Sequence, residues 1–225
     1  MRKIYKFDPH THTAETSGCS IISAVQMVEM YHAAGFGGIA ITDHLYEGLA
    51  SRFNDWETCI DYFLQGYKAA KKHGDRLGLD VILGVEMRFY TNCGDYLVYG
   101  IDEDFLRKNP NPHKLGPKKF FKRYGDELMI IQAHPYRWND IPNMGSIHGV
   151  EVYNGNPRHP NQNHKTRKLC AAHPELYTTS ASDTHEPGDV GGGWMEFDLP
   201  ITDAKMFRER VMRRKYVLRQ AKDEG

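Results

Sequence analysis

Residues 38–44 read GIAITDH, a short apolar run that leads directly into Asp43 and His44. A run of this kind is typical of a strand buried on both faces, as in a parallel sheet. Polar side chains that follow such a strand lie at its carboxyl end, where α/β barrels carry their chemistry. This segment therefore predicts the class of fold and the edge of the sheet at which a site would form.

Four more predicted strands lead into residues of the types that bind metal ions. These strands cover residues 2–7, 80–84, 128–133 and 176–180, and the residues that follow them are His10, His12, Glu86, His134, Asp183 and His185. In a parallel α/β barrel all such strand ends meet at one edge. We therefore expect these six side chains, together with His44, to converge on one site.

The rest of the chain alternates between further strands and amphipathic helices. Strands are predicted at 38–42, 96–101, 149–153 and 216–219, and helices at 20–34, 56–73, 117–124, 161–173 and 203–214. The alternation favours an α/β fold with a mostly parallel sheet, and seven or eight such strands suit a small barrel. Residues 1–225 contain no internal repeat and are expected to form a single domain.

The ligand types indicate which metals such a site would take. His10 and His12 are two residues apart, so on an extended chain their imidazoles point to the same side and can bind one ion. The Glu86 carboxylate can bridge two ions, and Asp183 and His185 repeat the spacing with mixed ligands. Imidazole and carboxylate ligands without thiolate suit Zn, Mn or Fe. Seven ligands exceed one tetrahedral site but fit two or three divalent ions that share a bridge.

Composition argues against several classes of protein. The 225 residues include 29 Lys and Arg and 29 Asp and Glu, so the chain lacks the basic footprint of a general nucleic-acid binder. The four cysteines form no CxxC pair, which argues against a zinc ribbon or a dithiol redox motif. No signal sequence and no apolar run long enough to cross a membrane are visible. The expected location is the reducing cytoplasm, with free thiols and no membrane partner.

Taken in order, five motifs resemble those of the PHP family (polymerase and histidinol phosphatase). They are His10-Thr-His12-Thr, Ile-Thr-Asp43-His44, Gly-Val-Glu86, Ala-His134-Pro and Ser-Asp183-Thr-His185, and the match runs from residue 7 to about residue 193. The resemblance implies a distorted seven-stranded (β/α) barrel, similar to a TIM barrel, with a metal centre at the carboxyl ends of its strands. It also implies two or three metal ions and, usually, phosphoester hydrolysis.

Motif position further implies how the ligands are shared. One ion would be bound by His10, His12, Glu86 and Asp183, a second by Glu86 and His134, and a third by His44 and His185.

The sequence departs from the family pattern in two places. Members often carry an Asp or His five or six residues after the second His of the HxH motif, where this chain offers only Glu15 or Cys19. The third ion is therefore bound through one of these residues, or its site is weak or missing. Some members also place a His after the fourth strand. Asp102 stands there in this chain, either as a ligand or, as we prefer, as a turn residue.

Arginine side chains are the expected phosphate binders, because a guanidinium can donate two parallel hydrogen bonds to an oxyanion. Arg137 lies three residues after His134, and the resemblance favours an Arg there, so it is a candidate for both catalysis and substrate binding. Arg88 lies two residues after Glu86 and would point to the same side of an extended chain.

Two further assignments complete the predicted site. Arg158 and His159, in a loop rich in Asn, are candidates for substrate binding. Asp43 is a candidate for the acid that protonates the leaving oxygen, with a neighbouring His as the alternative.

The leading hypothesis is a metal-dependent phosphoesterase that hydrolyses a small phosphorylated metabolite or nucleotide through a metal-activated water. Such a chain is expected to act without an appended polymerase, and the sequence indicates no particular oligomer. A second hypothesis is an amidohydrolase-like metallohydrolase of an amide or lactone bond. A third is a non-catalytic metal-binding domain.

Overall fold

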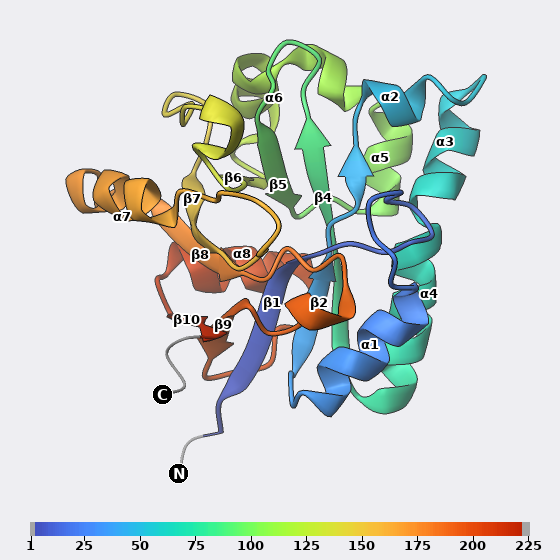
Figure 1. Cartoon of the computed structure of the whole chain (residues 1–225). Coiled ribbons are helices and arrows are strands. Elements are labelled where there is room, and N and C mark those ends of the chain that lie inside the picture. Colours follow the sequence, from blue (N-terminus) through green and yellow to red (C-terminus); the bar gives the residue numbers. More distant parts are fainter. Residues whose placement is uncertain (1–2, 222–225) are drawn as a thin grey trace.

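A ten-stranded mixed sheet organises the molecule and curls into a nearly closed barrel (Figure 1). The computed structural model describes residues 3–221. The strands are β1 (Tyr5–Thr11), β2 (Gly38–Ile41), β3 (His44–Leu45), β4 (Asp80–Arg88), β5 (Asp95–Tyr99), β6 (Met129–Gln132), β7 (Gly149–Asn154), β8 (Tyr177–Ala181), β9 (Gly193–Phe197) and β10 (Val217–Gln220). Their order is β10-β9-β1-β2-β4-β5-β6-β7-β8, with β3 paired to β4. A parallel bridge between Thr11 and Thr184 links the chain after β8 to the end of β1.

The barrel-like α/β fold agrees with the sequence-based expectation, but the strand count and the strand directions differ from it. Within residues 3–221 the structure has ten strands where the resemblance implies seven, and β5 runs antiparallel to both β4 and β6. The loop of residues 89–94 explains this direction, because a parallel connection needs a crossover of a dozen residues or more. At the other side of the sheet, β9 runs antiparallel to β1 and β10 runs antiparallel to β9.

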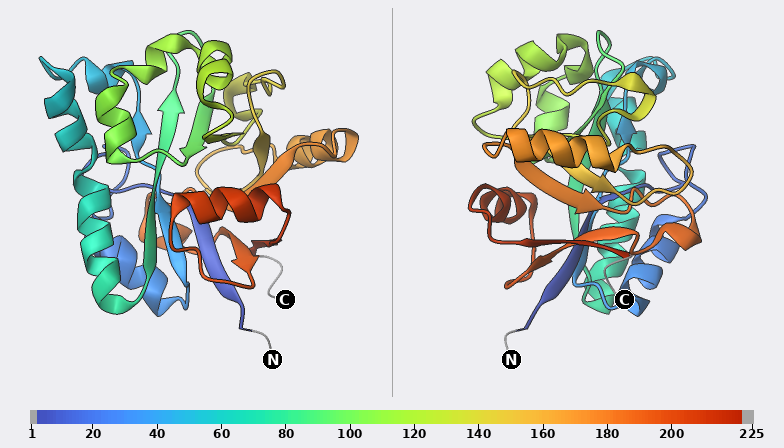
Figure 2. Two further views of the ribbon diagram at one scale, coloured as in Figure 1. Left: turned by 180° about the vertical axis from the view of Figure 1, so that it is seen from behind. Right: turned by 60° about the vertical axis from the view of Figure 1, so that its left-hand side comes forward.

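Helices cover both faces of the sheet. They are α1 (Ala24–Ala33), α2 (Glu47–Ala50), α3 (Trp56–Phe63), α4 (Gln65–Leu77), α5 (Glu103–Lys108), α6 (Pro117–Tyr124), α7 (Asn163–Ala172) and α8 (Ala204–Met212), with short 3-10 turns η1 (Pro112–Leu115), η2 (Arg137–Asn139) and η3 (Pro187–Asp189). Seen from behind, α8 crosses the strands, while α1 and α4 line one side of the sheet (Figure 2). None of the helices within residues 3–221 is long and apolar enough to span a membrane.

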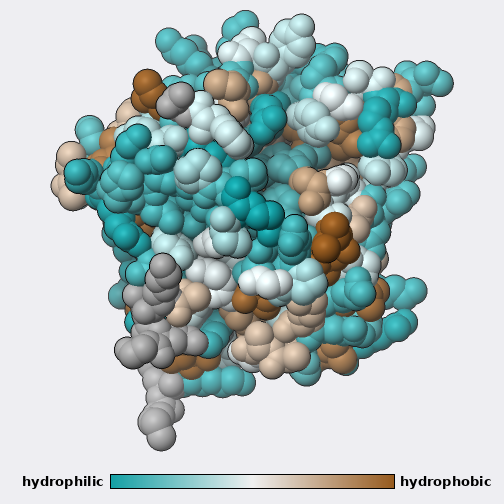
Figure 3. Space-filling view, viewed as in Figure 1, coloured by the Kyte–Doolittle hydropathy of each residue, from teal (hydrophilic) through white to brown (hydrophobic). Residues whose placement is uncertain are grey.

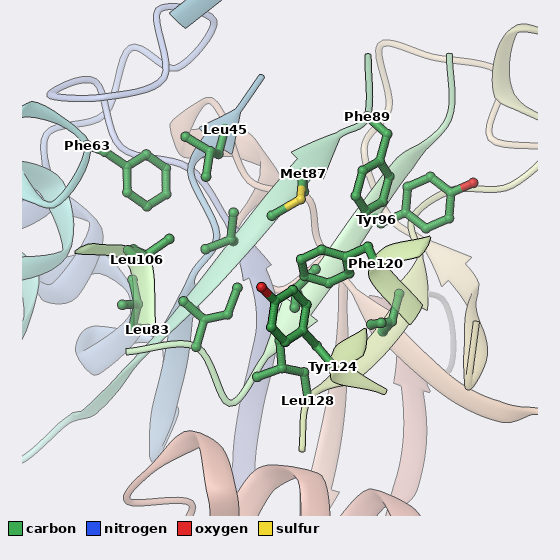
Figure 4. Packing of buried hydrophobic residues seen from close by; sticks show 14 of the residues in the cluster. Leu45, Phe63, Leu83, Met87, Phe89, Tyr96, Leu106, Phe120, Tyr124 and Leu128 are labelled. Carbon is green, nitrogen blue, oxygen red and sulfur yellow. The ribbon is translucent and has the colours of Figure 1, made fainter. Parts of the chain in front are cut away.

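The largest apolar cluster fixes the half of the sheet that carries β4 and β5. Phe89 packs against Tyr96 and Phe120 with ring centroids 5.2 and 5.3 Å apart, and Phe120 packs against Tyr124 at 5.0 Å (Figure 4). Side chains of β4 alternate between the two sheet faces, so Val85 and Met87 join this cluster while Glu86, between them, points to the opposite face. The core therefore holds Glu86 at a fixed place on a rigid strand.

Most predicted elements appear within a few residues of their expected bounds. The helix predicted at 117–124 coincides with α6. The helix predicted at 20–34 starts at Ala24, because Ser23 rather than Ser20 accepts the capping hydrogen bond from the Gln26 N–H. The helix predicted at 56–73 is two helices, α3 and α4, separated at Leu64.

The first and ninth strands differ most from the sequence prediction. The strand predicted at residues 2–7 begins outside the described residues, and the observed β1 continues to Thr11, so His10 lies within the strand. Its pairing with β2 shifts register between Asp8 and Thr11. The sequence pattern did not indicate β9, which follows a glycine-rich loop and closes the sheet against β1.

Candidate metal centre

All seven predicted metal-binding side chains meet at one end of the barrel, and an eighth joins them. Their ligand atoms form overlapping groups, each with all members within 4.8 Å of one another. The groups are His12, His44 and His185; His10, His12 and Glu86; His10, His134 and Asp183; and Glu86, His134 and Asp95. The expected convergence of the strand ends is therefore present.

Six strands, β1, β3, β4, β5, β6 and β8, position these side chains at or near their ends. Backbone pairing between β3 and β4 sets His44 directly beside Glu86. His134 follows β6, and Asp183 follows β8, and both adopt positive φ angles, 27° and 54°. Non-glycine residues rarely adopt this conformation, and it is concentrated at functional sites, where the surrounding structure stabilises it.

Glu86 lies at the middle of the cluster, with one carboxylate oxygen toward His134 and the other toward His44 and His12. Its Oε1 atom is 2.9 Å from His134 Nε2, and its Oε2 atom is 2.8 Å from His44 Nδ1 and 3.3 Å from His12 Nε2. The residue is 1% exposed, and among the described residues Oε2 accepts no hydrogen bond of good geometry. A buried carboxylate oxygen in this state fits a bridging ligand between two ions.

The two histidines of the HxH motif have opposite electrostatic environments. Burial lowers the pKa of His10, but the carboxylates of Asp183, Glu151 and Glu86 outweigh it and raise the pKa well above its usual value. Burial and the neighbouring His185 and His44 lower the pKa of His12 well below its usual value. His12 is thus held neutral, the form that binds metals. The Nε2 atoms of His10 and His12 lie 3.0 Å apart.

Three buried carboxylates surround these imidazoles, and their negative charge requires compensation by positive charge. Glu86, Glu151 and Asp183 are each 1% exposed or less. The Arg137 guanidinium binds Asp183, with its Nη2 2.9 Å from Oδ2. Burying charges without compensation is costly, so divalent cations fit this donor set.

Glu151 was not among the predicted site residues. It lies in β7, where its Oε1 is 2.9 Å from His10 Nδ1 and its Oε2 accepts the His134 N–H at 2.8 Å. A carboxylate that binds the second nitrogen of a ligand imidazole fixes the orientation of the ring. A single acidic residue within the apolar run GVEVY was the signal in the sequence.

Asp95 was also missed, because the prediction sought site residues only after the carboxyl ends of strands, in a mostly parallel sheet. In the antiparallel pair, Arg88 faces Asp95, so the amino end of β5 lies at the site. The turn residues of TNCG, 91–94, between two apolar runs were a hairpin signal.

Asp43 and Arg137 lie close to the cluster, but their side chains are already engaged in hydrogen bonds with other residues. The Asp43 carboxylate accepts hydrogen bonds from Thr13 N, Thr13 Oγ1 and Ser17 Oγ, and its Oδ1 is 4.0 Å from His12 Nδ1. Burial raises the pKa of Asp43 to about 6. Arg137 is 6% exposed, and its guanidinium also binds the side-chain oxygens of two asparagines.

A pocket of about 300 Å³ opens beside the cluster and is the natural place for a substrate. Glu86, His44, Arg88, Arg52 and Tyr46 are among its lining residues. The Arg88 guanidinium binds both oxygens of Asp95. The face of the molecule in Figure 3 is mainly hydrophilic over its central part.

The structure places the other predicted substrate residues in a neighbouring loop. Arg158 binds both carboxylate oxygens of Asp189, at 2.8 and 2.6 Å. The His159 ring lies 5.5 Å from the ring of Trp138, an exposed residue. These contacts keep both residues outside the groups of ligand atoms.

The sequence departs from the family pattern at Glu15, Cys19 and Asp102, and these three residues lie in different places in the structure. The Glu15 carboxylate accepts the Ala24 N–H at the start of α1. Asp102 accepts the Phe105 N–H at 2.7 Å and caps α5, in agreement with the preferred turn role. Cys19 lies beside the cluster: burial raises the pKa of its thiol, but hydrogen bonding to His185 and His44 outweighs burial and lowers it to about 6.

The fold and the site together define an α/β barrel-like protein with clustered imidazole and carboxylate side chains that could hold metal ions. A sequence profile of the PHP domain matches residues 8–194. The chain therefore belongs to the PHP domain family. A comparison with curated proteins gives no match.

Solved structures share this fold at low sequence identity. A two-domain protein from Bacteroides vulgatus, described as containing a predicted PHP-like metal-dependent phosphoesterase, is 16% identical with a TM-score of 0.69, covering 97% of this chain and 65% of that one. This chain thus spans just under two thirds of that protein. A lesion-specific endonuclease from Pyrococcus furiosus is 13% identical with a TM-score of 0.62, covering 94% and 56%. An amidohydrolase from Chromobacterium violaceum, solved with bound sulfate and no metal, is 18% identical with a TM-score of 0.55, covering 97% and 99%.

Proposed function

We propose that this protein is a metal-dependent phosphoesterase that hydrolyses a small phosphorylated metabolite or nucleotide. The observation that carries the proposal is the position of Glu86, whose two oxygens face His134 on one side and His44 and His12 on the other. A carboxylate between two sets of imidazoles is the arrangement expected of a bridging ligand in a centre with two or more ions.

The residues that would hold two or three ions of Zn, Mn or Fe are those of the ligand groups. They are His10, His12, His44, Glu86, His134, Asp183 and His185. Divalent ions bound there would supply positive charge for phosphoryl oxygens and lower the pKa of water.

The chain's own residues would hold the ligands in place and bind the substrate. We assign Arg137 to holding Asp183, and Glu151 to orienting His10. We assign Asp43 to positioning the loop beside His12, because its oxygens already accept three hydrogen bonds. Arg88, half exposed in the pocket wall, is the best-placed candidate to bind a phosphoryl group.

The size of the pocket favours a small substrate. A volume of about 300 Å³ lies at the lower end of the range for small-molecule sites. Hydrolysis of an amide or lactone at the same ligands is the alternative activity, and the likeness to an amidohydrolase fold is the observation that favours it. We retain the cytoplasm as the proposed location, since all four cysteines are free.

Metal analysis and a substrate panel test this proposal. We expect the wild type to bind two or more ions and to release phosphate from at least one sugar phosphate or nucleotide. His134→Ala removes an imidazole 2.9 Å from the bridging carboxylate and should lose at least about tenfold in metal affinity, together with activity. His164→Ala, on the exposed face of α7, is the matched control and should behave as wild type.

Two results would overturn the proposal. Ions bound without release of phosphate from any panel member, but with hydrolysis of amides or lactones, would establish the alternative. A chain that binds no divalent ion would reject every metal-dependent function.

A further inference from the structure

A second cavity, of about 430 Å³, adjoins the pocket beside the ligand cluster, and we call it the outer cavity. Tyr46 and Arg88 line both the pocket and the outer cavity, so the two spaces meet at these side chains. Glu47, at the start of α2, and residues 89–93, in the loop between β4 and β5, form the rest of its lining. A molecule bound beside Glu86 can therefore extend past Arg88 into the outer cavity.

The charges around the outer cavity indicate which part of a phosphorylated substrate it would take. Among its described lining residues Arg88 is the one cation, and it stands where the cavity meets the pocket. The Glu47 carboxylate already has partners, since His113 Nε2 and Lys114 Nζ lie 2.9 and 3.3 Å from its Oε2. A phosphoryl group is therefore favoured at Arg88, beside the ligand cluster, and the uncharged part of the substrate is left for the outer cavity.

Tyr46 forms a fixed aromatic wall between the two spaces. Its ring lies 6.5 Å from the His44 ring at an interplanar angle of 83°. The ring also lies against Gly48 of α2, where an added Cβ would be 2.5 Å from Tyr46 Cε2. Tyr46 is nevertheless 40% exposed, so part of its surface can contact a ligand.

Tyr90 presents a second aromatic ring from an anchored loop. The Tyr90 N–H donates to the His113 carbonyl oxygen at 3.1 Å, and the preceding Phe89 is buried in the apolar cluster. The Tyr90 residue itself is 71% exposed. A tyrosine on a fixed backbone gives a large contact area at a small cost in conformational entropy.

We propose that the outer cavity binds the organic part of the substrate, and that Tyr46 and Tyr90 select phosphoesters that carry an aromatic or heteroaromatic ring such as a nucleobase. Such rings stack on aromatic side chains. Thr91 and Asn92 add polar groups to the same lining, which suit the polar edge of a heteroaromatic ring. This inference rests on the proposed function and narrows its substrate class.

A comparison of AMP with ribose 5-phosphate tests the assignment, because both carry a sugar phosphate and only AMP carries a base. We expect the wild type to prefer AMP by at least about tenfold in kcat/KM. Tyr90→Ala and Tyr46→Ala should each lose about tenfold on AMP, mainly through KM, and much less on ribose 5-phosphate. Tyr90→Phe, which keeps the ring, is the matched variant and should keep most of the preference.

Calorimetry provides a readout that does not depend on hydrolysis. It uses the phosphonate analogues of the two compounds, in which a C–P bond replaces the scissile ester. The AMP analogue should bind more tightly than the ribose analogue, and Tyr90→Ala should remove most of the difference.

Equal kcat/KM for the two esters in the wild type, or an AMP preference that persists in Tyr90→Ala, would overturn the proposal while the phosphoesterase function stands. Tighter binding of the AMP analogue that depends on the Tyr90 ring, without phosphate release from either ester or any other panel member, would support the outer cavity and overturn the proposed function.

Discussion

The two arginines nearest the ligand cluster differ in how deeply they are buried. Arg137 is 6% exposed, and its guanidinium contacts Asp183 directly. Arg88 has a side chain 49% exposed and lines the pocket beside Glu86. We therefore expect Arg137 to act on a substrate only through Asp183, and Arg88 to touch a substrate directly.

This difference predicts a division between kcat and KM. Arg137→Met should weaken metal binding by about 10–100-fold and lower kcat, because it leaves the Asp183 carboxylate without its partner. Arg88→Met should mainly raise KM. Steady-state kinetics with metal titration would check both, with Lys118→Met on the exposed face of α6 as the control. A KM effect for Arg137→Met with unchanged metal affinity would contradict the assigned role.

The site residues that could be predicted from the sequence and those that were missed differ in their position along the strands. His44 and His134 come after apolar runs and Asp183 comes after a predicted strand, so the pattern itself marks them. Glu151 lies inside a strand, flanked by residues that bury it, so no strand-end rule selects it. Asp8 directly follows the strand predicted at residues 2–7 but was not selected, and the observed β1 extends past it. Asp8 accepts hydrogen bonds from the His10 N–H and the Tyr31 hydroxyl, and burial raises its pKa to about 6.

At the scale of secondary structure, the direction of β5 decides which acidic residue belongs to the site. Asp95 opens the strand at the ligand cluster, while Asp102, beyond its other end, caps α5. A parallel β5 would have reversed these roles.

Substitution of Asp102 should affect the stability of the fold, whereas substitution of Asp95 should affect metal binding. Asp102→Ala should lower the free energy of unfolding by about 0.5–2 kcal/mol through loss of the helix cap, with metal content unchanged. Asp95→Asn should leave α5 intact and change metal content or KM, since it alters a member of the Glu86 and His134 group. Urea unfolding and metal analysis distinguish them, and metal loss from Asp102→Ala would count against the antiparallel assignment.

Periodicity located the helices well but could not reveal the break at Leu64. Ile60, Phe63, Leu64 and Tyr67 keep helical spacing across it, so the apolar face is continuous although the helix is not. The Leu64 N–H still donates to Ile60, and the Lys68 N–H donates to Leu64. Only the backbone angles, which a residue pattern does not report, distinguish two helices from one.

Although the net charge of the whole chain is zero, the charged side chains in its interior are unevenly distributed. Glu86, Glu151 and Asp183 lie together in the barrel with little exposure. Divalent ions that bind only the folded chain should therefore stabilise it, by about 2.7 kcal/mol at a free concentration 100 times the dissociation constant.

Chelation should lower the melting temperature of the wild type, and added Zn²⁺ or Mn²⁺ should restore it. Glu86→Gln, which removes the charge of the central carboxylate, should show a much smaller shift on chelation. Thermal unfolding followed by circular dichroism would measure both. Equal melting temperatures of the wild type with and without chelator would refute a metal centre that forms only in the folded state.

The pairing of β1 with β9 carries a consequence for how the protein is made. His10 lies in β1, which is synthesised well before β9. β1 pairs with β9 as well as with β2, so β1 and its HxH motif lack one pairing partner until β9 has been synthesised. Contacts between such distant segments also slow folding, because a long loop must close before they form. The HxH motif therefore cannot reach its final surroundings until β9 has been synthesised, and the site forms late although its first residues are made early.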